Sequence, residues 1–164
     1  MKRIIDLIAA VIGLCFTSSC GKDLFEQVLL DGNWGLVRDE MVTSINGEVT
    51  EPIITDCDPF HPRDEMDTQL AIRKISGNEY EFSEYYWNRL GGEWVFSNRE
   101  TYILRNNVLF MLVNGRETEY GHFSVSASEL SIESIFITEE LIAGVRIQTS
   151  TISRRVYRRL SNLL

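Results

Sequence analysis

The chain has 164 residues, of which 16 are basic and 24 are acidic, so its net charge at neutral pH is −8. This acidic balance disfavours nucleic acid and anionic lipid surfaces as partners, and its simplest consequence is solubility. A chain of this length suffices for one domain with a single hydrophobic core.

The first nineteen residues have the layout of a secretory signal peptide. Lys2 and Arg3 give a positive start, residues 7–16 form an apolar run interrupted only by Gly13, and small residues follow up to Cys20. The apolar run of about ten residues is too short to cross a hydrocarbon core of roughly 30 Å as a helix. We therefore predict cleavage before Cys20; the alternative is an N-terminal anchor helix that stays uncleaved.

The end of this segment resembles a lipoprotein signal, in which a small residue precedes the lipid-modified cysteine. Ser19 stands before Cys20, so the resemblance implies that Cys20 carries a diacylglycerol and an N-acyl chain. At about 0.8 kcal/mol per buried methylene, two or more chains anchor a protein stably. Gly21-Lys22-Asp23 is similar to the export signal of surface lipoproteins of Bacteroidetes. The expected location is thus the cell envelope, as an outer-membrane lipoprotein on the cell-surface or the periplasmic face.

Removal of residues 1–19 leaves 145 residues with 14 basic and 23 acidic side chains, a net charge of −9. Apart from Cys20, this mature chain has only Cys57, so it can form no internal disulfide. The expected organisation is a signal peptide over residues 1–19, a lipidated tether with a short helix over residues 20–31, and a β-barrel domain over residues 32–164.

The mature chain begins with a short amphipathic helix, because the apolar residues of 24–29 fall on one helical face. A first strand opens at residue 32. Asn-Gly pairs at 46–47 and 114–115 are strong hairpin-turn signals. Residues 51–67 hold all three prolines of the chain and are predicted to form a long loop, a feature that is often functional or mobile.

From residue 68 onward, short runs of alternating apolar and polar residues predict strand after strand. A polar break at residues 97–99 indicates a β-bulge, and residues 138–144 are expected to form a helical turn. The expected strands lie at residues 68–75, 79–89, 93–104, 108–113, 116–125, 129–137 and 145–160. About eight strands joined by tight turns predict an all-β, antiparallel, up-and-down barrel, since closure removes bare sheet edges. A barrel of eight strands can hold one small ligand.

Three features of this pattern resemble the lipocalin-like lipoproteins of Bacteroidetes, which are relatives of the calycin superfamily. Gly32-Asn33-Trp34 is similar to the Gly-x-Trp motif that opens the first strand of lipocalins. The predicted helix over residues 24–29 is similar to the helix that plugs the closed end of lipocalin barrels. Residues 153–159 are similar to the basic last strand of lipocalins. The resemblance implies a lipocalin-like barrel in which Arg158 or Arg159 packs across the Trp34 ring. The alternative is that Trp34 is simply a core aromatic.

Eight of the 17 aromatic residues lie between residues 80 and 102, on two predicted strands joined by a glycine turn. Facing each other across a hairpin, they are expected to form one wall of a cavity, and ligand cavities combine apolar walls with a few polar groups. The alternative is ordinary sheet packing. The candidate ligand-binding residues are Tyr80, Phe82, Tyr86, Trp94, Phe96 and Tyr102.

No arrangement of residues in the sequence indicates catalysis. His61 and His122 are the only histidines, and neither a nucleophile elbow nor a metal-binding helix motif is present. The carboxylates around Cys57 and His61 could hold calcium, and Cys57 with His61 could hold zinc. The spacing of these residues favours a solvated acidic loop instead. We expect neither an enzyme nor a bound metal or cofactor.

Two functions remain open. The first is a lipid-anchored binding module that takes a small apolar or amphipathic ligand inside the barrel, with the membrane as a partner through its lipid. The second is an interaction or inhibitor module with a filled barrel, which binds a protein or a glycan through its loops or outer face. An open cavity near residues 80–102 favours the first function, and a tightly packed interior favours the second.

Overall fold

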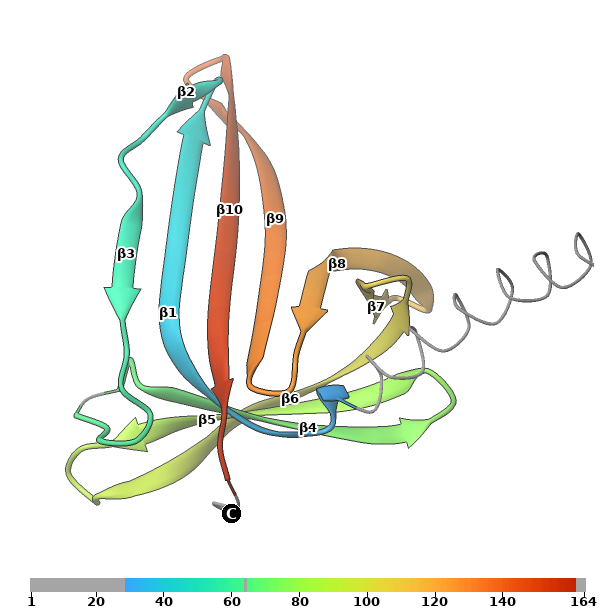
Figure 1. Cartoon of the computed structure of the whole chain (residues 1–164). Helices are drawn as coiled ribbons and strands as arrows, with labels where there is room; N and C mark the ends of the chain where they lie inside the picture. Colours follow the sequence, from blue (N-terminus) through green and yellow to red (C-terminus); the bar gives the residue numbers. More distant parts are fainter. Residues whose placement is uncertain (1–28, 64, 162–164) are drawn as a thin grey trace, which may run out of the picture.

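The computed structural model describes residues 29–63 and 65–161. The predicted signal peptide, Cys20 and all but the last residue of the predicted helix over 24–29 lie outside this part of the chain. Within the described residues, no helix is long and apolar enough to cross a membrane. Figure 1 shows that this part consists almost entirely of strands.

Ten antiparallel strands form one continuous sheet in the described part of the chain. The two Asn-Gly hairpin turns are confirmed, because both residues of each pair have positive φ, 51° and 87° at 46–47 and 52° and 76° at 114–115. The strands are β1 (Gly32–Ile45), β2 (Glu48–Val49), β3 (Ile53–Asp56), β4 (Thr68–Ser76), β5 (Glu79–Asn88), β6 (Glu93–Arg105), β7 (Val108–Val113), β8 (Arg116–Val125), β9 (Glu129–Ile142) and β10 (Val145–Arg159).

Eight of these strands close into a barrel, in the order β1, β4, β5, β6, β7, β8, β9, β10 and back to β1. β1 closes it, because its first residues pair with β4 and almost its whole length pairs with β10, from Trp34↔Arg159 to Ile45↔Thr149. The predicted all-β antiparallel barrel of about eight strands is thus confirmed. β2 and β3 are additions that pair with β1.

Two segments differ from the sequence prediction. Residues 138–142 are strand rather than a helical turn, because they continue β9 and pair with β10 as far as Ile142↔Val145. Residues 53–56, predicted to be loop, form β3 and pair with residues 38–41 of β1. In both places the hydrogen bonds to a neighbouring strand decide the conformation, and local residue patterns do not report such pairing.

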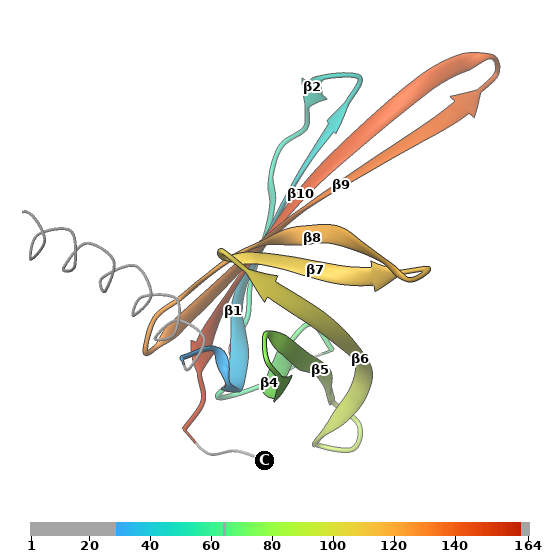
Figure 2. The same ribbon diagram turned by 90° about the vertical axis from the view of Figure 1, so that its right-hand side faces the viewer.

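The barrel is continuous at one end and splayed at the other. β8 pairs with β9 only from Gly121↔Ser134 to Val125↔Leu130, and β6 pairs with β7 only over residues 102–105. Beyond these pairs the strands diverge, and β9 and β10 continue beside β1 as a projecting ribbon (Figures 1 and 2).

The continuous end is sealed by Leu30, Trp34 and Arg159. Leu30 and Trp34 are fully buried, and Trp34 Nε1 donates a hydrogen bond of 3.0 Å to the Leu30 carbonyl. The Arg159 guanidinium lies over the Trp34 ring, 4.2 Å from its centroid. Of the two arginines proposed from the resemblance, Arg159 therefore makes the contact, whereas Arg158 is exposed on the outer face.

Candidate ligand cavity

The barrel lumen opens at the splayed end into a cavity of about 280 Å³. Every barrel strand except β1 contributes to its lining, which consists of Leu70, Phe82, Glu84, Asn98, Glu100, Tyr102, Leu109, Tyr120, Ile132, Ser134, Phe136, Ser153, Arg155 and Tyr157. Asn98, Glu100 and Phe136 are exposed and mark the mouth, whereas Leu109 and Tyr157 are buried at the floor. The interior of the barrel is therefore open rather than filled.

Four aromatic rings form a continuous row along the cavity wall. The ring centroids lie 4.8 Å apart for Phe82 and Tyr102, 5.0 Å for Tyr102 and Tyr120, and 5.9 Å for Tyr120 and Phe136. The interplanar angles are 56°, 56° and 76°, which are the tilted and edge-to-face arrangements that aromatic pairs prefer. The row runs from β5 to β9 and provides the cavity with a rigid apolar wall that carries two phenol groups.

A β-bulge in β8 directs Tyr120 into the cavity. The pairing of β7 with β8 shifts register between Leu109 and Phe110 and leaves Tyr120 as the extra residue. The adjacent Gly121 is buried, and a Cβ there would lie 2.1 Å from the Glu133 carbonyl oxygen of β9. Glycine is thus required for β8 to approach β9 at the point where the two strands begin to diverge.

Of the six predicted ligand-binding residues, Phe82 and Tyr102 line the cavity. Tyr80 is fully buried in the core, one step along the same face of β5 toward the closed end. Tyr86 lies beside a separate hollow that it shares with Glu84 and other residues. The remaining two, on β6, do not line the cavity.

A second β-bulge accounts for the position of Trp94 and Phe96. Ser97 is the extra residue of β6, and the predicted bulge over residues 97–99 is thereby confirmed. The inserted residue reverses the alternation of side chains, so that Phe96 packs on Tyr85 and Trp94 packs on Trp87. These pairs lie on the outer face of the hairpin, opposite to the lumen.

Arg155 is the single basic residue that lines the cavity among the described residues, and two carboxylates hold it. Its Nε lies 3.4 Å from Asp39 Oδ2, and its Nη1 lies 3.4 Å from Glu84 Oε1. Burial acts to lower the pKa of Arg155, but Tyr157, Asp39 and Glu84 outweigh burial and raise it. Burial in turn raises the pKa of Tyr157, whose phenol is hydrogen-bonded to Arg155. The charge of Arg155 is therefore already balanced by protein groups.

Glu100 and Ser134 line the cavity without a hydrogen-bond or ion-pair partner among the described residues. Glu100 lies at the mouth on β6, on the same face as Tyr102. Ser134 is only 5% exposed, and its side chain borders the cavity. A hydroxyl group can donate and accept hydrogen bonds, so a ligand in the cavity could bond to Ser134. Sequence reasoning missed both residues, because neither belongs to the aromatic pattern.

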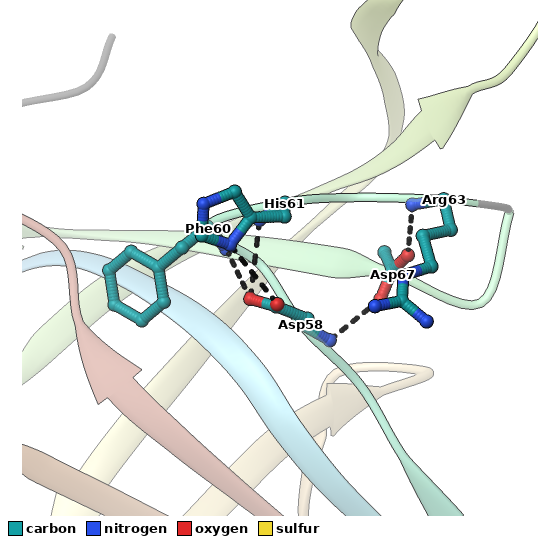
Figure 3. A network of polar contacts seen from close by, with 5 residues as sticks. All are labelled: Asp58, Phe60, His61, Arg63 and Asp67. Carbon is teal, nitrogen blue, oxygen red and sulfur yellow. Dashed lines mark hydrogen bonds and ion pairs between the residues drawn. The ribbon is translucent and has the colours of Figure 1, made fainter.

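The acidic loop uses its carboxylates to hold its own backbone (Figure 3). Asp67 is buried and accepts hydrogen bonds from the N–H groups of Asp58 and Arg63, at 3.0 and 2.6 Å. Asp58 accepts hydrogen bonds from the backbone of Phe60 and His61 and from the His61 ring. Slight burial acts to raise the pKa of Asp58, but these hydrogen bonds lower it.

The carboxylates of Asp58 and Asp67 are thus occupied by protein donors. In the described part of the chain, no three His, Cys, Asp or Glu side chains lie close enough to hold a metal ion together. Cys57 donates a weak hydrogen bond from Sγ to the Met66 carbonyl at 3.6 Å and packs against the core. The geometry of the loop is that of a structural connection between β3 and β4.

No protein-family model matches the chain, and no curated protein matches it in sequence. The resemblance to lipocalin-like lipoproteins therefore stays a prediction from the residues that carry it. The barrel class itself is established by the closed sheet of eight strands.

Proposed function

We propose that this protein is a lipid-anchored lipoprotein of the cell envelope whose barrel binds a small amphipathic ligand in its lumen. The observation that carries the proposal is the open cavity of about 280 Å³ between Phe82, Tyr102, Tyr120 and Phe136. Its lining joins aromatic and aliphatic walls to a few polar groups, the composition that is typical of small-molecule sites. An open interior also favours this function over that of a filled barrel.

The position of the first described residues suits a lipid anchor. Leu29 and Leu30 lie at the closed end, whereas the mouth of the cavity lies at the other end of the barrel. Cys20 is nine Cα-to-Cα steps from Leu29, a distance of at most about 30 Å when the chain is fully extended. With lipid on Cys20, the closed end would face the membrane and the mouth would stay accessible to a ligand.

Lipid attachment is tested by replacing Cys20 with alanine in cells fed a radioactive or clickable fatty acid such as palmitate. The Cys20→Ala protein is expected to carry no acyl label and to leave the membrane fraction. Cys57→Ala is the matched control and is expected to keep the label. Acyl label at the wild-type level on Cys20→Ala contradicts the anchor proposal.

The projecting ribbon supports a second candidate function, binding of another protein through the outer face. Ile135, Ile152 and Val42 lie in direct register across β9, β10 and β1, on the face that does not continue into the lumen. Ile135 is 52% exposed, and Leu141 further along β9 is 74% exposed. Exposed aliphatic residues that gather on one surface commonly mark a site of protein contact.

Ligand binding is tested by extracting the purified wild-type protein with organic solvent and identifying co-purifying small molecules by mass spectrometry. Ser153→Trp places an indole in the cavity, and Ser124→Trp places the same side chain on the exposed face of β8. A molecule that is present with the wild type and Ser124→Trp but absent with Ser153→Trp supports lumen binding. Equal amounts with all three proteins contradict it.

A further inference from the structure

We infer that the cavity selects an organic cation, namely a small amine or guanidine whose apolar body packs against the aromatic row. The inference rests on the proposed function, since it names the class of ligand that the same lumen takes. It follows from three properties of the cavity: its uncompensated negative charge, the groups available to a cation, and its size.

The charged groups in and beside the cavity favour a positive ligand. Three carboxylates lie in or beside the cavity, those of Glu84, Glu100 and Asp39, and among the described residues the one basic group there is Arg155. Arg155 already forms ion pairs with Asp39 and Glu84, each at 3.4 Å. The carboxylate of Glu100 is left without a partner in the described residues. An anionic ligand would compete with Asp39 and Glu84 for Arg155, whose Nε has an ion pair but no hydrogen bond, and it would meet the charge of Glu100. A cation can pair with Glu100 and break no existing ion pair.

The uncharged groups of the cavity also suit a cation. The faces of the Tyr102 and Tyr120 rings carry partial negative charge and attract an ammonium or guanidinium group within about 6 Å. The hydroxyl oxygen of Ser134, on the cavity lining, can accept a hydrogen bond from such a donor. Glu100 lies two residues from Tyr102 on the same strand face, so the carboxylate and the ring line one side of the cavity.

The volume of the cavity limits the ligand to a small molecule. At about 30 Å³ for each water molecule in the liquid, a space of this volume holds roughly nine waters, which corresponds to a ligand of about ten non-hydrogen atoms. Leu70, Leu109 and Ile132 at the floor would take its apolar part. A phenylalkyl amine meets both requirements.

The test uses three ligands of matched shape, 4-phenylbutylamine, 4-phenylbutan-1-ol and 4-phenylbutanoate. Each is titrated calorimetrically into the full chain reconstituted in phosphatidylcholine nanodiscs, with empty nanodiscs as the blank. The amine is expected to bind about tenfold more tightly than the alcohol, the difference that a single charge-assisted hydrogen bond provides. The carboxylate is expected to bind more weakly than the alcohol.

Two glutamine substitutions on β6 locate the selectivity. Glu100→Gln is expected to lower the affinity for the amine about tenfold and to leave the affinity for the alcohol unchanged. Glu93→Gln lies on the same strand but outside the cavity, and it is expected to change neither affinity. Both positions are exposed, so neither substitution removes a core contact.

The outcomes separate this inference from the proposed function. If the alcohol or the carboxylate binds as tightly as the amine, or if Glu100→Gln keeps the preference for the amine, the cation selectivity is wrong while a ligand-binding lumen stands. If none of the three ligands binds to the wild-type protein, both the selectivity and the proposed lumen function are overturned.

Discussion

Arg159 and Trp34 are directly opposite each other in the ladder that joins the last strand to the first, and the guanidinium carbon lies 4.2 Å from the centroid of the ring. Arg159 also donates hydrogen bonds to the carbonyl oxygens of Leu29, Asp31 and Ala127. One side chain thereby connects β10, the start of β1 and the turn before β9. This arrangement closes the barrel at the end away from the cavity.

Trp34→Ala is expected to lower the free energy of unfolding by about 3 to 5 kcal/mol, the usual cost of removing a large buried aromatic side chain. Trp34 is fully buried at the closed end, so its truncation would leave a cavity in the core. Urea denaturation followed by far-ultraviolet circular dichroism measures the change. Trp87→Ala, on the outer face of the β5–β6 hairpin, is the matched control and should cost clearly less; equal losses would contradict the described role of Trp34.

Arg159→Ala and Arg158→Ala are expected to differ, because neighbouring residues of a strand point to opposite faces. Arg159→Ala removes a partly desolvated contact between a cation and an aromatic ring and should cost about 1 to 2 kcal/mol. Arg158 is exposed, so Arg158→Ala should change the free energy of unfolding by less than about 0.5 kcal/mol. The same denaturation experiment distinguishes the two variants. A larger loss for Arg158→Ala than for Arg159→Ala would contradict the contact between Arg159 and Trp34 at the closed end.

Gly121→Ala is expected to destabilise the barrel by about 1 to 3 kcal/mol, the usual cost of an extra methyl group in a site without space. The new Cβ would meet the Glu133 carbonyl oxygen at 2.1 Å, and β8 would have to move away from β9. Ser124→Ala, at an exposed position of the same strand, serves as the control with little effect. Hydrogen exchange at residues 130–134 should become faster in Gly121→Ala alone; unchanged exchange would contradict this close approach.

Much of the fold could be predicted from the sequence, because the signals were local. The Asn-Gly turns and the alternation around Leu70 and Phe82 follow from residue patterns, and the structure has them. The pairing of the first strand with the last was expected from barrel closure and from the family resemblance, and the structure has it as well. Strand pairing over long distances was not predictable in this way. The formation of β3 beside β1 depends on backbone groups 12 to 18 residues apart, from Met41↔Ile53 to Arg38↔Asp56.

The cavity was predicted only in part, for a related reason. Phe82 and Tyr102 followed from alternation on one hairpin, but Tyr120 owes its direction to a bulge opposite β7. A bulge at Ser97 likewise turned Phe96 away from the lumen. Phe136 was within reach of sequence reasoning, because it continues the inward alternation of Leu130 and Ile132 on β9.

Alkaline pH is expected to destabilise the protein through its buried phenols. Burial raises the pKa of Tyr157 and of Tyr102 above the ordinary value of about 10. Their contribution to stability is complete below about pH 10 and is lost as pH rises from there toward the raised pKa, because only the unfolded chain then releases the proton. The loss amounts to at most about 1.4 kcal/mol per pH unit for each such group.

Tyr157→Phe removes one of these phenols and should therefore make the free energy of unfolding fall less steeply above about pH 10. Urea denaturation at several alkaline pH values gives this slope for the variant and for the wild type, and circular dichroism at neutral pH verifies that the variant is folded. Identical slopes for the two proteins would show that the phenol of Tyr157 is not buried as described.

The most direct test of lumen binding is a calorimetric titration of 4-phenylbutylamine into the wild type, Ser153→Trp and Ser124→Trp. Ser153 lines the cavity, whereas Ser124 lies exposed on the outer face of β8, so the two variants differ in where they place the same indole. Binding is predicted for the wild type and for Ser124→Trp with the same affinity, and no binding is predicted for Ser153→Trp. Undiminished binding to a folded Ser153→Trp protein would contradict a ligand site in the lumen.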